Sequence, residues 1–309
     1  MRGLRFTSLL LLAALVCIPA FGQAIEPLSE PNFSYVQKKL EAKGVHARFI
    51  RLLAKSQVSE KTRDRIIYTN LKGFRIKPDY SGHLDSPALE KCQIFIKKHA
   101  KTFELEERLY GVPKEVVASL LWVETRHGKR TGKFKLPEVF TSIALADHPF
   151  FIQSAIDKLK LEISPQDADF PLIPEKVQAA AKRKADWAVG ELVALAELHS
   201  KKGVQSFRLK GSYAGAFGIP QFLPSSYLNW AVSQKKSQRP DLFKPQDAIL
   251  SVGNFLKSHG WVAEVTSHAE ALYAYNRSRA YSLTILTLAG RLDPAQRSLA
   301  HSALKPSSP

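Results

Sequence analysis

The stretch from Tyr110 to Lys129 has the apolar spacing of an α-helix that packs on a protein core. At 3.6 residues per turn, its apolar side chains project into one arc, which comprises Val116, Val117, Leu120, Leu121 and Val123. Pro113 and Glu115 suit the first helical turn, because a helix start tolerates proline and favours acidic residues. We therefore expect a helix here, around which the rest of the fold is organised.

One acidic residue, Glu124, projects inside this apolar arc. A carboxylate on a core-facing stripe must be paired, lie in a cleft, or keep its proton because a low dielectric disfavours the charged form. A raised pKa suits a general acid. The alternative is that the stem of Glu124 packs while its carboxylate reaches solvent or pairs with Arg126, Lys129 or Arg130. Position alone leaves both interpretations open.

Helical patterns occupy most of the remaining chain. They span residues 33–43, 46–55, 86–109, 138–146, 150–161 and 175–202. Ser86 is the expected cap of the third pattern. Glycine and proline between Arg65 and Leu84 favour an extended segment or irregular loops, and residues 164–174 have the composition of a loop. We predict a mainly α fold with minor irregular or β segments.

The first 24 residues have the composition of a secretory signal peptide. Arg2 and Arg5 precede a leucine-rich run, and small residues follow it. The run is shorter than the roughly 20 residues that a membrane span needs, and Val16 before Cys17 is not the small residue that normally adjoins a lipid-modified cysteine. We expect an exported protein, periplasmic or associated with the cell wall, with no integral membrane span and no lipid anchor.

After the signal peptide we expect one unit over residues 25–292, built as one large domain or two intimately packed ones, and a polar tail at 293–309. About 285 mature residues suffice for a sizeable core, and no flexible linker interrupts residues 32–292. Cys92 is then the last cysteine, so no intramolecular disulfide can form. Packing must stabilise the fold.

The chain is strongly basic, with a formal net charge of +17 that becomes +15 once Arg2 and Arg5 are removed. Such a charge favours anionic partners. For an exported protein these are cell-wall polymer, anionic lipid headgroups or released nucleic acid. The charge alone does not choose among them.

A second informative stretch runs from Gly211 to Tyr227, where glycines alternate with aromatic residues and prolines. Glycine lets the backbone approach a ligand closely, and Tyr213, Phe222 and Tyr227 offer flat apolar faces. Gln221 adds a hydrogen-bond donor and an acceptor. The mixture suits a sugar, although a loop packed on the core explains the same composition.

A third cluster, from Tyr273 to Tyr281, places Tyr275 and Asn276 at the junction between two helical patterns. By itself the cluster indicates little, because Asn276 or Ser278 there is equally explained as an ordinary helix cap. The cluster becomes informative only when it is considered together with the other two stretches.

Together these segments resemble the lytic murein transglycosylase B family, glycoside hydrolase family 103, over residues 33–292. The motifs that carry the resemblance are YGVP at 110–113, VETRHG at 123–128, GSYAGA at 211–216 with Gly218, QFLPSSY at 221–227, DAI at 247–249, HGW at 259–261, and YN at 275–276 with Tyr281. The family has a lysozyme-like helical core. It cleaves the MurNAc to GlcNAc bond of peptidoglycan without water and leaves a 1,6-anhydromuramyl end.

The resemblance implies that Glu124 protonates the glycosidic oxygen and then accepts a proton from the substrate's own 6-hydroxyl. Glycosidases usually pair two carboxyls, but an internal nucleophile removes the need for the second. It also implies that a further set of residues orients the glycan or supports Glu124, namely Ser212, Gln221, Phe222, Tyr227, Tyr275, Asn276 and Tyr281. The implied partner is the peptidoglycan glycan strand rather than nucleic acid.

One departure from the family concerns calcium, because some members carry an EF-hand-like loop before the DAI helix. Calcium needs six to eight oxygen ligands, usually from several carboxylates. Here residues 229–246 contain Asp241 as their single carboxylate, among several cations. Nor do the nine histidines form a zinc pattern such as H-E-x-x-H. We expect no metal and no cofactor.

Two other functions stay open. A lysozyme-like muramidase would admit water and yield a reducing end, which only product analysis separates from transglycosylation. A noncatalytic wall-binding protein would keep the sugar site without turnover, and the presence of Glu124 argues against it.

Overall fold

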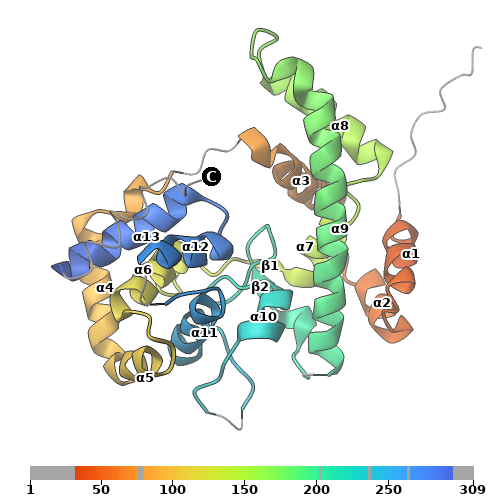
Figure 1. The fold of residues 1–309 in the computed structure, drawn as a ribbon. Helices are drawn as coiled ribbons and strands as arrows, with labels where there is room; N and C mark the ends of the chain where they lie inside the picture. The colour runs from red at the N-terminus through yellow and green to blue at the C-terminus, as the bar shows by residue number, and fades with distance from the viewer. Residues whose placement is uncertain (1–31, 76–78, 202, 236–237, 263–264, 295–309) are drawn as a thin grey trace, which may run out of the picture.

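The computed structural model describes residues 32–75, 79–201, 203–235, 238–262 and 265–294, and its regular structure is almost entirely helical (Figure 1). The strands β1 (Phe134–Lys135) and β2 (Lys210–Gly211) pair antiparallel, with Phe134 opposite Gly211. The predicted mainly α fold with minor β segments is confirmed. The expected signal peptide and residues 295–309 of the expected tail lie outside the described residues.

α-Helices make up most of the described chain, and short 3-10 helices lie between some of them. The α-helices are α1 (Ser34–Ala42), α2 (Ala47–Ala54), α3 (Glu60–Leu71), α4 (Ser86–Lys98), α5 (Ala100–Tyr110), α6 (Lys114–Thr125), α7 (Leu136–Ile143), α8 (Pro149–Glu162), α9 (Ile173–Ser200), α10 (Pro224–Trp230), α11 (Pro245–Ser258), α12 (Val265–Tyr275) and α13 (Arg279–Leu292). Short 3-10 helices are η1 (Lys72–Arg75), η2 (Ser81–His83), η3 (Phe170–Leu172) and η4 (Ser206–Arg208).

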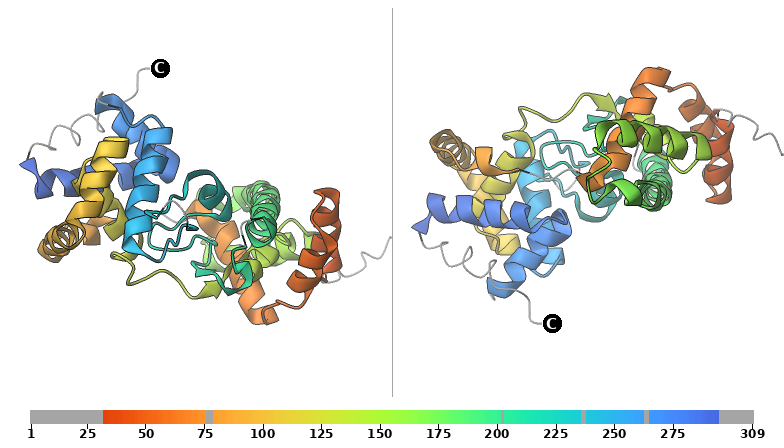
Figure 2. Two further views of the ribbon diagram at one scale, coloured as in Figure 1. Left: turned by 90° about the horizontal axis from the view of Figure 1, so that it is seen from below. Right: turned by 90° about the horizontal axis from the view of Figure 1, so that it is seen from above.

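The helices form two groups, with β1 and β2 between them (Figure 1, Figure 2). In one group α6 packs against α4, α11 and α13, while α5 packs against α11. In the other, the long helix α9 packs against α3, α7, α8 and α10. Of the stretches singled out in the sequence, the one that carries Glu124 forms α6 in the first group. The glycine-rich stretch begins at β2, and the segment after β2 lies between the two groups.

Helix α6 is the most enclosed element of its group. Every residue from Glu115 to Trp122 is buried, so the helix is covered on all sides rather than along one apolar arc. Four helices surround it, α4, α5, α11 and α13. The wider burial arises because serine and alanine on the remaining faces are small enough for neighbouring helices to approach.

The segment from Arg65 to Leu84 differs from its prediction. Helix α3 continues through it to Leu71, and only short 3-10 turns follow. Ile66, Ile67 and Leu71 are buried at helical spacing where α3 meets α7 and α9. The glycines and prolines that favoured loops begin at Gly73, after the helix has ended, so the predicted irregular segment started too early.

The pattern at 86–109 also differs, because it forms two helices rather than one. Helix α4 ends at Lys98, and His99 has φ −114°, outside the helical region, before α5 begins at Ala100. The His99 ring packs on Phe95, with 4.7 Å between ring centroids. The cap of α4 is Asp85 instead of Ser86, since the Asp85 carboxylate accepts a hydrogen bond from the Ala88 amide at 2.9 Å.

The long helix and the remaining cysteine agree with expectation. Helix α9 covers almost all of the predicted 175–202 pattern. Cys92 is a free, buried thiol on α4. Within the residues described, no helix combines the length and apolar character needed to cross a membrane.

One carboxyl group lies inside the core, at the contact between α5 and α11. Glu106 is fully buried, and neither of its oxygens has a hydrogen-bond partner among the described residues. Gly253 of α11 makes the room, since a Cβ at that position would lie 2.1 Å from Oε1 of Glu106. Burial, and then the neighbouring Glu107, raises the pKa of Glu106 to about 9. The side chain is therefore neutral at pH 7.

This proton makes the stability of the fold depend on pH. An unfolded glutamate ionises near pH 4.3. Between there and about pH 9 the folded chain holds a proton that the unfolded chain has lost, so each pH unit costs the folded state about 1.4 kcal/mol. The stabilisation that this proton provides is complete below the unfolded pKa, near 4.3, and is lost as pH rises through the folded pKa of about 9.

As pH rises from 6 to 8, the free energy of unfolding of the wild type should fall by about 3 kcal/mol through this proton. Glu106→Gln has no such proton, so it should gain that amount relative to the wild type. Urea unfolding at the two pH values measures the change. Glu104→Gln, exposed on the same helix, is the matched control and should follow the wild type. Parallel pH profiles for Glu106→Gln and the wild type would contradict the burial of a neutral acid.

Candidate active site

Glu124 lies in the last turn of α6, just before the chain turns sharply. Arg126 and His127 have φ values of 54° and 55°, in the left-handed region, and Gly128 follows with 92°. Non-glycine residues in this region carry strain and persist where their surroundings hold them. Thr125 supplies that hold: its hydroxyl donates to the Ile219 carbonyl at 2.8 Å and accepts from the Gly128 amide at 2.9 Å.

The carboxylate of Glu124 is half-buried and is held by a tyrosine. The Tyr281 hydroxyl donates to Oε1 of Glu124 at 2.5 Å. Tyr281 is 1% exposed, in the first turn of α13. Burial raises the pKa of Glu124 to about 7, and the hydrogen bond from Tyr281 opposes the shift. The carboxyl group is thus poised to give and take a proton near neutral pH.

The cations close to Glu124 in sequence do not neutralise it. The Arg126 guanidinium lies over the Trp122 ring, 4.4 Å from its centroid, and donates to the Gly82 carbonyl at 3.1 Å. Among the described residues, no lysine or arginine lies within ion-pair distance of Glu124. The salt-bridge interpretation of Glu124 is therefore not what the structure shows.

Aromatic rings gather around Tyr281. The Tyr275 ring is stacked on it, with 6.3 Å between centroids and 13° between planes, and the Tyr275 hydroxyl donates to the Pro220 carbonyl. The Tyr80 ring meets Tyr281 edge-on at 5.7 Å. Burial raises the pKa of Tyr80, and the nearby Glu124 carboxylate adds to this. Tyr80 thus belongs to the site, although sequence reasoning missed it because it lies in an irregular segment without a motif.

The stretch from Gly211 to Tyr227 reaches the site chiefly through its backbone. The carbonyls of Ile219 and Pro220 accept from Thr125 and Tyr275. Gln221 has φ 53°, and its side chain donates to the Gly218 carbonyl at 2.9 Å and to the Thr131 carbonyl at 3.3 Å. The Ser212 hydroxyl accepts from two amides of its own turn, those of Ala214 and Ala216. These side chains shape the loop that meets Glu124.

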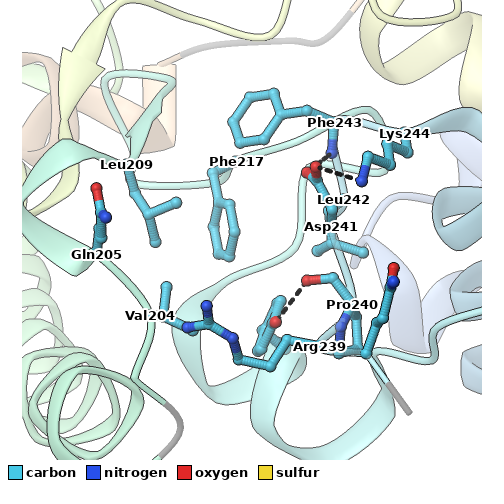
Figure 3. A pocket seen from close by; sticks show the side chains of 12 residues that line it. Val204, Gln205, Leu209, Phe217, Arg239, Pro240, Asp241, Leu242, Phe243 and Lys244 are labelled. Atoms are coloured by element: carbon cyan, nitrogen blue, oxygen red, sulfur yellow. Dashed lines mark hydrogen bonds and ion pairs between the residues drawn. The ribbon is translucent and has the colours of Figure 1, made fainter. Parts of the chain in front are cut away.

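Phe222 and Tyr227 lie deeper than their predicted contact with sugar suggests. Phe222 is 2% exposed and packs against Tyr275, 5.9 Å between centroids, so it supports that ring from the core. The Tyr227 hydroxyl donates to the Pro240 carbonyl at 2.6 Å. Tyr227 and Phe217 line a cavity of about 650 Å³, whose other lining residues include Arg239 and Asp241 (Figure 3). Glu124 is not among the residues that line this cavity, and a direct role of Phe222 or Tyr227 in sugar binding stays a prediction.

The turn between α12 and α13 presents Asn276 and fixes Tyr281. Asn276 is exposed. Ser278 is the N-cap of α13, because its hydroxyl accepts from the Tyr281 amide at 3.3 Å. Of the two caps that the sequence left open, the structure selects Ser278, and it leaves the Asn276 side chain at the surface.

Residues 229–246 are organised by protein groups in the part that the structure describes. The buried Asp247 carboxylate accepts from the Gln234 amide at 2.9 Å and from the Asp241 amide at 2.7 Å. Asp241 itself caps the Phe243 amide and pairs with Lys244. Across the described ranges, no group of three or more histidine, cysteine or acidic side chains could hold a metal ion.

Comparison with known proteins gives the family. The model of the transglycosylase SLT domain family matches residues 29–271. The chain belongs to this family. Over 208 residues it is 28% identical to the membrane-bound lytic murein transglycosylase B of Escherichia coli (strain K12), covering 66% of this chain and 48% of that protein. The match thus spans about half the length of this curated relative.

Solved structures share the fold. Soluble lytic transglycosylase SltB1 from Pseudomonas aeruginosa superposes with a TM-score of 0.62 and 20% identity, over 86% of this chain and 99% of that one. SltB3 from Pseudomonas aeruginosa, solved in complex with NAG-anhNAM-pentapeptide, superposes with a TM-score of 0.59 and 17% identity, over 85% of this chain and 80% of that one. These likenesses confirm the predicted lysozyme-like, SLT-type fold. Tyr275, Asn276 and Tyr281 lie beyond the span of the family model, and the structure itself brings Tyr281 to Glu124.

The Tyr281 hydrogen bond predicts how activity of this SLT domain responds to pH. The bond favours the ionised form of Glu124, so Tyr281→Phe should raise the pKa of Glu124 further. A hydrogen bond to a charged group is worth about 1.5–3 kcal/mol, or about one pH unit and upward. We expect the alkaline limb of the kcat/KM profile to move to higher pH by about one unit.

The control is Tyr275→Phe, which removes a hydroxyl that bonds to Pro220 rather than to Glu124. Its alkaline limb should stay where the wild type has it, whatever happens to the maximum rate. An unmoved limb in Tyr281→Phe, or equal shifts in both variants, would show that Tyr281 does not set the pKa of Glu124.

Proposed function

We propose that the chain is a peptidoglycan lytic transglycosylase that cleaves the MurNAc to GlcNAc bond without water and leaves 1,6-anhydroMurNAc ends, with Glu124 as its one general acid and base. The observation that carries the proposal is the setting of Glu124. Its carboxyl group is half-buried, the Tyr281 hydroxyl donates to Oε1 at 2.5 Å, and burial raises its pKa to about 7. Glycosidases that use water or a protein nucleophile usually pair two carboxyls, whereas an internal nucleophile removes the need for the second.

The geometry around Glu124 suits a single group that acts twice. Tyr281 engages Oε1, which leaves Oε2 to face the glycosidic oxygen. With a pKa of about 7, a large share of the molecules hold the proton at neutral pH and can donate it as the bond breaks. The resulting carboxylate then takes the proton of the substrate's 6-hydroxyl, which closes the anhydro ring. Positive charge at the anomeric carbon is stabilised by the substrate's acetamido group or by nearby dipoles.

The relatives support this substrate and product. SltB3 is described in complex with a pentapeptide-bearing NAG-anhNAM ligand, and the Escherichia coli relative is named as a lytic murein transglycosylase. We infer that this chain acts on the same class of polymer. The substrate then places the enzyme at the peptidoglycan layer, periplasmic or wall-associated, in keeping with its net charge of +17.

Digestion of purified peptidoglycan tests the proposal against the noncatalytic alternative. Soluble fragments with 1,6-anhydro ends, identified by mass spectrometry, are the expected result. Binding to the polymer without release of fragments would refute it in favour of a wall-binding protein. Fragments with reducing ends would instead identify a muramidase of the lysozyme type.

A further inference from the structure

A pocket of about 540 Å³ lies between α3 and the turn that follows β2, apart from the residues grouped around Glu124. Its lining includes Lys61, Arg65 and Ile66 from α3, Lys133 just before β1, Phe134 in β1, and Tyr213. The side-chain amide of Asn70 on α3 donates to the Tyr213 carbonyl at 3.4 Å, which keeps the turn against the helix. Figure 1 shows this turn beside α3.

Three cations of this pocket have no counter-charge. Lys61, Arg65 and Lys133 are exposed, and within the described residues none of them forms an ion pair or a side-chain hydrogen bond. The nearby Asp64 is paired with Arg63, 2.9 Å away. A hollow lined by charges of one sign concentrates the field and attracts an anion, and an arginine binds a carboxylate with two parallel hydrogen bonds.

The rest of the pocket is apolar. Ile66 is buried and Phe134 is half-buried. Tyr213 is 46% exposed, a large fraction for an aromatic residue. A cationic rim over an apolar wall suits a short peptide with a carboxylate better than a bare inorganic anion, which would leave the wall unused. Neutral sugar hydroxyls, in turn, would leave the three cations unpaired.

The pocket is built on the same segments as the candidate active site. Lys133 follows two residues after Thr131, whose carbonyl accepts from Gln221. Tyr213 directly follows Ser212, and Gly132 lies against the backbone of Gly211. The pocket and the loop that meets Glu124 thus share the segments around Thr131 and Ser212.

We propose that this pocket binds the carboxylate-bearing stem peptide that branches from MurNAc, so that the enzyme recognises peptide-substituted strands through a subsite distinct from Glu124. The inference rests on the proposed function, because it assumes a peptidoglycan substrate. Lys61, Arg65 and Lys133 pair with peptide carboxylates, while Phe134 and Tyr213 cover the apolar part of the stem.

The test compares two variants on two substrates. The first variant is Lys61→Gln/Arg65→Gln/Lys133→Gln, and the matched control removes three exposed cations elsewhere, as Lys97→Gln/Lys98→Gln/Lys101→Gln. The substrates are glycan strands that carry stem peptides and the same strands stripped of peptide by an amidase. On peptide-bearing strands we expect the first variant to lose at least tenfold in kcat/KM through a higher KM. On stripped strands it should match the wild type, and the control variant should match the wild type on both.

Equal losses on both substrates would overturn the proposal, since the cations would then act on the glycan or on overall charge. No loss on either substrate would overturn it as well. Direct binding of a soluble disaccharide pentapeptide, against the same disaccharide without peptide, gives a readout that needs no turnover. A wild-type protein that binds the pentapeptide ligand through these cations yet cleaves neither strand would contradict the proposed function and not the pocket.

Discussion

Glu124→Gln should fold like the wild type and release peptidoglycan fragments at least about 10³-fold more slowly. The amide keeps the size of the side chain and can still accept the hydrogen bond that Tyr281 donates to Oε1. It cannot donate the acid's proton to a leaving oxygen, nor take one from the 6-hydroxyl.

The control for this variant lies on the same helix. Glu115 is also buried, near the start of α6, and pairs with Lys114 at 3.3 Å. Glu115→Gln removes a carboxylate from α6 without touching the end that carries Glu124, so its rate should stay within a few-fold of the wild type. Fragment release per folded molecule is the measurement. Substantial residual activity in Glu124→Gln would sink the assignment of this residue.

Gly132→Ala should destabilise the fold by about 3 kcal/mol or more. A Cβ at this position would lie 2.1 Å from the carbonyl carbon and oxygen of Gly211 and 2.5 Å from the Ser212 nitrogen. All three are backbone atoms, so no side-chain rotation relieves the clash. The two segments must separate, which breaks the pairing of β1 with β2. The left-handed φ of 92° adds its own cost for a residue with a Cβ.

Gly111→Ala separates these two costs. Gly111 also has a left-handed φ, 71°, but a Cβ there would meet nothing within 4 Å. Its loss of stability should therefore stay near the 1–2 kcal/mol of the backbone conformation alone. Urea unfolding of the two variants gives the comparison. Equal losses would mean that the close approach of Gly132 to Gly211 does not hold β1 and β2 together.

The sequence predicted those features that depend on local spacing. The helix that carries Glu124 and the long helix α9 follow from periodicity. Residue types narrowed the cap of α13 to Asn276 or Ser278, and the structure selects Ser278. Helix α3 was missed because Gly73, Pro78 and Gly82 dominate the composition of residues 65–84, whereas packing of Ile66 and Leu71 keeps the chain helical up to Leu71. The break at His99 was missed because helical apolar spacing continues across it.

The contacts of the site were beyond local reasoning. Tyr281 lies 157 residues from Glu124 along the chain, and no spacing rule connects them, although the family motifs included both. Tyr80 joins the same cluster from a segment without a recognisable pattern. Conversely, Phe222 and Tyr227 have the composition of a sugar platform, yet the fold buries both rings. An aromatic residue in a glycine-rich loop can serve the core or a ligand, and only the packing decides.

The central claim is that the substrate's own 6-hydroxyl, and not water, attacks the anomeric carbon. Well-oriented intramolecular reactions reach effective molarities on the order of 10⁵ M or more, far above the concentration of liquid water, so cyclisation should win at a half-buried Glu124. Digestion of peptidoglycan in ¹⁸O-labelled water tests this most directly. The account predicts new muramyl ends that are 1,6-anhydro and carry no label; reducing ends that carry ¹⁸O would contradict it and show that the protein is a hydrolytic muramidase.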